Sequence, residues 1–144
     1  MANTTAIANS FKVDLMGGVH SLANAETIKA ALFLVSGALD ATTATYSTTS
    51  EVSGSGYSAG GVTVTHATAP TNSGSVGTTY WTPSAAISFG TVTLSTAFDY
   101  VQLYYSADSH AIAGFNFGST TVSGGTFTIN MPTNNGTTGL LRLT

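Results

Sequence analysis

A five-residue segment of the chain matches the pattern that carries the nucleophile of many serine hydrolases. Residues 56–60 read Gly-Tyr-Ser-Ala-Gly, which fits G-x-S-x-G. In those enzymes the serine stands on a sharp turn between an apolar strand and a helix. Here a polar segment rich in Ser and Gly precedes Ser58, and an alternating strand pattern follows it from Val62. The sequence therefore predicts a glycine turn that leads into a strand, with no nucleophilic role for Ser58.

The three histidines could bind a metal ion or transfer protons, because imidazole titrates near neutral pH. His20, His66 and His110 are more than 40 residues apart in the chain, so no two of them have the short spacing of a local metal site. Residues 108–110 supply Asp, Ser and His, but neighbours in a strand or tight turn do not converge on one reacting atom. These positions predict no metal site and no triad.

A pair of carboxylates can hydrolyse glycosidic bonds when folding brings them to opposite sides of the bond. Asp99 and Glu51 are candidates for such a pair, although nothing in their sequence surroundings points to this chemistry. We therefore predict a protein with no catalytic residue, no cofactor and no metal, which is not an enzyme.

One short helix is predicted near the start of the chain. Ile7, Phe11 and Leu15 have the i, i+4, i+8 spacing of one helical stripe. Thr4 or Thr5 can cap the start of this helix, and the glycines at 17 and 18 end it. We expect a helix or arm at about residues 4–17.

The rest of the chain has the pattern of short strands separated by turns. Residues 27–35 are short and continuously apolar, which favours a strand buried on both faces. The apolar positions change parity at Gly90, as at a β-bulge. Turn residues at 106–109, 118–125 and 132–139 separate the later strands, and residues 36–58 form a long connection. Further strands are expected at residues 62–65, 87–94, 98–105, 111–117, 126–131 and 140–143. Strands at this spacing predict one all-β sandwich or barrel domain over residues 1–144.

The composition excludes several classes of partner. Charged residues make up 6% of the chain, against about 25% in an ordinary domain, while Ser and Thr together number 43. Three bases and a net charge of −3 do not suit a nucleic-acid backbone or an anionic membrane surface. The longest apolar run, residues 30–35, is far shorter than the roughly 20 residues of a membrane span. The absence of cysteine excludes disulfides and thiolate metal sites.

The strand at residues 98–105 is apolar on both of its predicted faces. Alternation places Val101, Leu103 and Tyr105 on one face, and the other carries Phe98, Tyr100, Gln102 and Tyr104. The second face is covered either by another segment of the same chain or by a second subunit, because Tyr and Phe are enriched at interface cores. The candidate interface residues are Ile7, Phe11, Leu15, Phe98, Tyr100 and Tyr104.

Several segments follow one another in a recognisable order: Ser10-Phe11-Lys12, residues 27–33, residues 51–61, Phe115-Asn116-Phe117-Gly118, residues 127–133 and residues 139–143. This order of segments resembles that of the capsid cement or decoration proteins of tailed bacteriophages. The resemblance implies a jelly-roll-like antiparallel β-sandwich with a short N-terminal helix. It also implies a homo-oligomer bound outside the lattice of the major capsid protein, and no catalytic residues.

We therefore expect a structural protein of the virion that stabilises the head, assembled in the host cytoplasm and located on the outer capsid surface. Its partners would be the major capsid protein and itself, with a dimer favoured, and neither nucleic acid nor a membrane. The alternative is a carbohydrate- or host-binding β-sandwich of a phage fibre or tail. Exposed aromatic side chains would then stack on sugar rings, with Tyr80, Trp81 and Tyr104 as the candidates.

Overall fold

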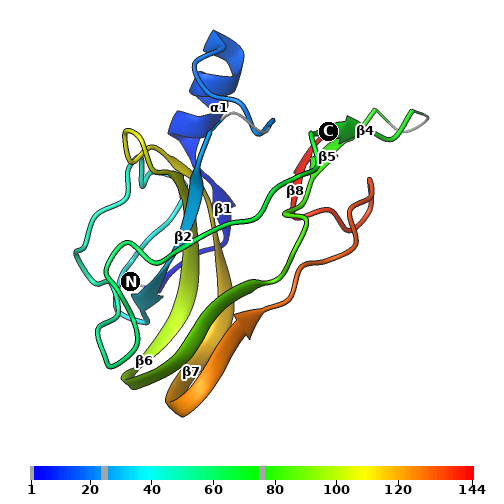
Figure 1. Ribbon diagram of the computed structural model, residues 1–144. Coiled ribbons are helices and arrows are strands. Elements are labelled where there is room, and N and C mark those ends of the chain that lie inside the picture. The colour runs from blue at the N-terminus through cyan, green and yellow to red at the C-terminus, as the bar shows by residue number, and fades with distance from the viewer. Residues whose placement is uncertain (1, 24–25, 75–76) are drawn as a thin grey trace.

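The protein consists of two antiparallel sheets packed together, with one short helix beside them (Figure 1). The computed structural model describes residues 2–23, 26–74 and 77–144. In chain order the elements are β1 (Ala6–Ile7), α1 (Asn9–Gly17), β2 (Ile28–Leu34), β3 (Val62–Thr63), β4 (Thr71–Asn72), β5 (Thr79–Trp81), β6 (Ile87–Tyr105), β7 (Ala111–Ile129) and β8 (Leu141–Leu143). The larger sheet has the order β1-β7-β6-β2-β3, and the smaller has the order β4-β5-β8. The predicted all-β sandwich with a short N-terminal helix is confirmed.

The expected strand at residues 27–35 is confirmed as β2, which lies between β6 and β3. Ile28, Ala30 and Leu32 belong to the main core, while Ala31 and Phe33 belong to a second cluster on the opposite face. A strand covered on both sides needs apolar residues at successive positions, which is why its sequence does not alternate.

The strands β6 and β7 form one long ribbon that extends beyond the other elements (Figure 1). The predicted parity change at Gly90 is confirmed, because the pairing register shifts between Ser88 and Thr91. The predicted turn at residues 118–125 is wrong, since β7 continues through it. Gly118 and Gly124 adopt positive φ angles of 89° and 61° at register shifts, so the strand bulges there without ending.

The N-terminal helix begins later than the sequence predicted. Residues 6–7 pair with Ala113 and Gly114 of β7, so Ile7 lies in a strand and the helix starts at Asn9. The helix ends as predicted, with Gly18 in the left-handed conformation at its C-cap. Thr5 does not cap the helix, because its hydroxyl accepts the backbone N–H of Asn116. In the described part of the chain, no helix is both long and apolar enough to cross a membrane.

The second face of β6 is covered by the same chain. The connection at 36–61 places Leu39 and Tyr46 against Tyr100 and Tyr104, which are 2% and 4% exposed. Phe98 lies in the main core instead, because a register shift between residues 98 and 100 turns it to the other face. Other segments of the same chain therefore cover these three aromatic residues of β6, which is the first of the two alternatives that the sequence left open.

Candidate functional site

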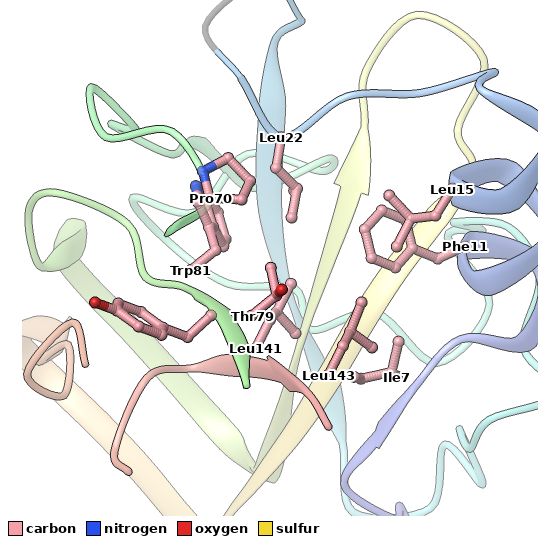
Figure 2. A pocket seen from close by; sticks show the side chains of 10 residues that line it. Ile7, Phe11, Leu15, Leu22, Pro70, Thr79, Trp81, Leu141 and Leu143 are labelled. Carbon is pink, nitrogen blue, oxygen red and sulfur yellow. The ribbon is translucent and has the colours of Figure 1, made fainter. Parts of the chain in front are cut away.

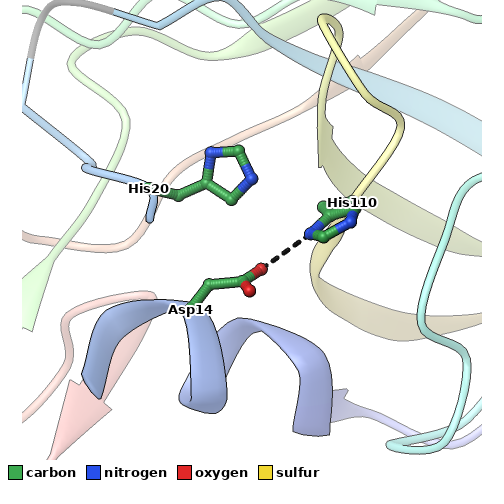
Figure 3. A group of neighbouring side chains, drawn as sticks. All are labelled: Asp14, His20 and His110. Carbon is green, nitrogen blue, oxygen red and sulfur yellow. Dashed lines mark hydrogen bonds and ion pairs between the residues drawn. The ribbon is translucent and has the colours of Figure 1, made fainter. Parts of the chain in front are cut away.

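Two histidines and three carboxylates meet at one end of the molecule, between the C-terminal end of α1 and the β6–β7 turn. We call them the His20 cluster, which comprises Asp14, His20, Glu26, Asp108 and His110. Asp14, His20 and His110 each offer one ligand atom, and these atoms all lie within 4.8 Å of one another (Figure 3). The cluster holds half of the chain's carboxylates and two of its three histidines, in a protein with only 6% charged residues.

Two turns bring these residues together. Gly18 has a φ of 66°, and the N–H of Val19 donates to the carbonyl of Asp14, so the chain reverses after α1 and returns His20 toward Asp14. In the β6–β7 turn, the N–H of His110 donates to Asp108 Oδ1 at 3.1 Å. Because this turn also closes the ribbon, it presents Asp108 and His110 at a defined position beside His20.

His20 lies between two carboxylates. Its Nδ1 is 2.8 Å from Glu26 Oε1, and its Nε2 is 2.8 Å from Asp108 Oδ2. The ring stacks on Tyr105 with 4.2 Å between centroids, and the His20 side chain is only 6% exposed. Burial by itself lowers the pKa of His20, but the hydrogen bond to Glu26 and the charges of the surrounding carboxylates outweigh burial and raise it.

The second histidine of the cluster has a separate carboxylate. His110 Nδ1 lies 2.8 Å from Asp14 Oδ2, and the two imidazole rings are 5.2 Å apart in an edge-to-face arrangement. The Asp14 side chain is 10% exposed and that of His110 is 36% exposed, so the cluster is open to solvent on the His110 side. Imidazole nitrogens and carboxylate oxygens are the ligands of many Zn²⁺ sites, and they also exchange protons near neutral pH.

The sequence did not predict this cluster. Asp14 and His110 are 96 residues apart in the chain, and only folding brings them together. A weak signal was present: most of the few charged groups stand in strand-free segments or in α1, where folding decides their neighbours. His66 reaches only the backbone of the cluster: its Nε2 lies 2.9 Å from the carbonyl oxygen of Glu26.

The G-x-S-x-G segment has the predicted local structure. Ser58 is exposed, its carbonyl accepts the N–H of Gly61, and β3 rather than a helix follows. Glu51 organises this segment, because its carboxylate accepts the hydroxyls of Tyr46 and Tyr57 at 2.6 and 2.7 Å. Glu51 thus holds the covering connection in place.

Asp99 and Glu51 do not share a partner. Asp99 is 7% exposed and accepts amide N–H groups from Asn3 and Asn116 at 2.6 and 2.8 Å. Each carboxylate therefore has its own hydrogen-bonding partners, and the structure gives no support for a pair that flanks one bond.

The predicted interface residues of the N-terminal segment line an apolar cavity of about 100 Å³ (Figure 2). Ile7, Phe11 and Leu15 face the smaller sheet across it, where Trp81 and Leu141 lie. Phe11 is 1% exposed, whereas Ile7 and Leu15 are half-buried. These side chains therefore pack mainly within the chain, between α1 and the β5–β8 pair.

Comparisons with known proteins found no similar protein. No protein-family model matches the sequence, and neither curated proteins nor solved structures give a match.

Proposed function

We propose that the protein is a structural component of a virus particle, a cement or decoration protein that binds the outside of the major capsid lattice. The observation that supports this proposal best is the uncharged outer half of the β6–β7 ribbon. Residues 87–97 and 117–129 contain no Asp, Glu, Lys or Arg. Their exposed positions are mainly hydroxyl residues: Ser88, Thr91, Thr93, Ser95, Thr96, Ser119, Thr121, Ser123, Thr126 and Thr128.

A ribbon of this kind suits a permanent protein contact. Hydroxyl groups lose water at lower cost than charges and still donate and accept hydrogen bonds across an interface. The β7 strand is also an edge strand beyond its short pairing with β1 at residues 113–114. Soluble proteins usually protect such an edge with charged residues or proline, and residues 117–129 have neither.

Self-association would use a different surface from the one that the sequence predicted. The aromatic residues of β6 are buried, but Val13, Met16 and Val19 are 69%, 92% and 61% exposed on and just after α1. Exposed apolar side chains grouped on one short element are typical of a contact surface. The homo-oligomer is therefore proposed to form through α1.

The alternative of a carbohydrate-binding module has less support. Of the three aromatic residues expected to stack on sugars, Trp81 is 1% exposed and Tyr104 is 4% exposed. A stacking platform requires an open ring face, so only the half-buried Tyr80 could serve.

Particles prepared with and without the protein test the proposed function. A clip that binds only the finished lattice stabilises that lattice by preferential binding. Depleted particles should release DNA at a lower temperature than complete ones, and added protein should restore the difference. If depleted particles are equally robust but fail to attach to cells, the host-binding alternative replaces this proposal.

Single lysine substitutions locate the contact on the ribbon. Thr91→Lys and Thr126→Lys each place a charge on the exposed face of one cross-strand pair, and each should reduce the amount of protein retained on particles. Thr48→Lys is the matched control, because Thr48 is exposed on the connection at 36–61. Equal retention of all three variants would exclude the ribbon as the contact.

A further inference from the structure

The geometry points to a binding site for one divalent transition-metal ion, Zn²⁺ or a chemically similar ion, held by Asp14, His20 and His110. This inference is independent of the proposed function, since it concerns the other end of the larger sheet. A metal ion there would join α1, the segment that follows it and the β6–β7 turn, in a chain that has no disulfides.

The first argument is the hydrogen-bonding state of His20. A carboxylate oxygen can only accept, so the contact between Nδ1 and Glu26 Oε1 places the ring proton on Nδ1. In the neutral ring, Nε2 then carries a lone pair. That nitrogen is buried and lies 2.8 Å from Asp108 Oδ2. In the neutral ring the lone pair would face a carboxylate, and a metal ion bound to both groups would remove that repulsion.

The second argument is the support that Glu26 gives to His20. Metal-binding histidines usually donate their other ring N–H to a carboxylate, which fixes the ring and increases its basicity. Glu26 does this through Oε1, while its Oε2 accepts the backbone N–H of Ser21 at 2.6 Å. The orientation of His20 is therefore set by a residue that would not itself bind the ion.

The third argument is the donor set. Two imidazoles and one carboxylate are typical ligands for Zn²⁺, with metal–ligand distances of about 2.0–2.2 Å. The ligand atoms of a tetrahedral zinc ion lie about 3.3 Å apart, so the three atoms within 4.8 Å need only small side-chain movements. Asp108 is close enough to His20 to supply a fourth ligand. The hard, all-oxygen sites that Ca²⁺ and Mg²⁺ prefer are not present here.

The charges of the cluster also favour a divalent ion. Asp14, Glu26 and Asp108 carry three negative charges around the histidines, and none of the three basic side chains forms an ion pair in the described part of the chain. One Zn²⁺ would offset two of these charges without a proton on either imidazole. The effect on the protein would be structural, because the ligands come from three separate segments.

Titration of untagged, EDTA-treated protein with Zn²⁺ and with Co²⁺ tests the inference. Calorimetry should show one Zn²⁺ per chain, and Co²⁺ should give the visible absorption of a low-symmetry nitrogen and oxygen site. Zn²⁺ should raise the melting temperature, and EDTA should reverse the increase. His20→Gln and His110→Gln should each weaken Zn²⁺ binding by more than about tenfold, and Glu26→Gln by about 10–100-fold.

One matched variant and one spectrum keep the test independent of folding defects. Asp40→Asn removes a carboxylate outside the cluster and should leave Zn²⁺ binding unchanged. In the wild-type protein, the ¹⁵N resonances of the His20 and His110 rings should shift on addition of Zn²⁺, while those of His66 stay in place. Absence of Zn²⁺ binding at 1 mM (about the weakest affinity of a specific site), or binding that survives both His20→Gln and His110→Gln, would overturn the inference.

Discussion

The rings of Tyr46 and Tyr104 stack with 4.3 Å between centroids and 9° between planes. Tyr104 belongs to β6 and Tyr46 to the connection at 36–61, so this pair closes the connection over the second face of the larger sheet. The hydroxyl of Tyr104 donates to the carbonyl of Gly60 at 2.7 Å and fixes the far end of the same connection. The connection at 36–61, which contains no regular strand, thus covers this face of the larger sheet, as the smaller sheet covers part of the opposite face.

Replacement of Glu51 should weaken the whole covering connection. Glu51→Ala removes the acceptor for the hydroxyls of Tyr46 and Tyr57 and for the N–H of Gly60. A buried donor left without an acceptor costs about 1–3 kcal/mol, so we expect the free energy of unfolding to fall by at least about 2 kcal/mol. Urea denaturation measures the change. Asp40→Asn keeps a side-chain oxygen that can accept the N–H of Thr42, so it should stay within about 0.5 kcal/mol of wild type.

A charge at Tyr104 should unfold the protein rather than dissociate a complex. Tyr104→Asp places a carboxylate at a position that is 4% exposed, and an unpaired buried charge costs several kcal/mol. Circular dichroism should show loss of the folded state. Val13→Asp, at a position that is 69% exposed, should remain folded. If the wild-type protein is an oligomer and the Tyr104→Asp variant is a folded monomer, Tyr104 lies at the subunit interface instead.

One glycine of β7 is required by a close side-chain contact. A Cβ atom at Gly114 would overlap the ring and hydroxyl of Tyr100, which is buried between two packed layers. Gly114→Ala should therefore destabilise the protein by about 1–3 kcal/mol or more, as overpacking does. Gly125→Ala is the matched control in the same strand, because its Cβ would meet only a side-chain methyl group of Val122 at 3.7 Å. Equal melting temperatures for the two variants would contradict this packing.

Alkaline pH should destabilise the fold. Burial is the main cause that raises the pKa of Tyr46, Tyr57, Tyr100, Tyr104 and Tyr105, and it raises the pKa of Tyr100 to about 12. A tyrosine in an unfolded chain has a pKa of about 10. The folded state therefore binds these protons more tightly, so their contribution to stability is complete below about pH 10 and is lost as the pH rises toward the folded values.

Urea denaturation at pH 9 and at pH 11.5 checks this dependence. The midpoint should fall at the higher pH, and the phenolate absorbance should appear together with unfolding rather than before it. Tyr100→Phe should reduce the fall, because it removes one of the groups with a raised pKa. An unchanged midpoint at pH 11.5 would show that the tyrosine hydroxyls are free to ionise in the folded state.

Local patterns in the sequence determined the identity of several elements. The strand β2, the end of α1 at Gly18 and the parity change at Gly90 were predictable, because each depends on residues within one turn or one strand. The strands β1, β4 and β5 were missed because they are short and, unlike β3 and β8, lie in segments without an alternating apolar pattern. The low charge and the hydroxyl-rich surface were also evident from composition alone.

Only the tertiary structure decided which residues share a face and which charges meet. A register shift moved Phe98 into the main core, and the connection at 36–61 buried Tyr100 and Tyr104, so neither outcome followed from alternation along β6. The His20 cluster likewise depends on the approach of the β6–β7 turn to the end of α1. Sequence spacing reports on neighbours within one element, whereas a site built from three separate segments depends on long-range packing, which the spacing does not encode.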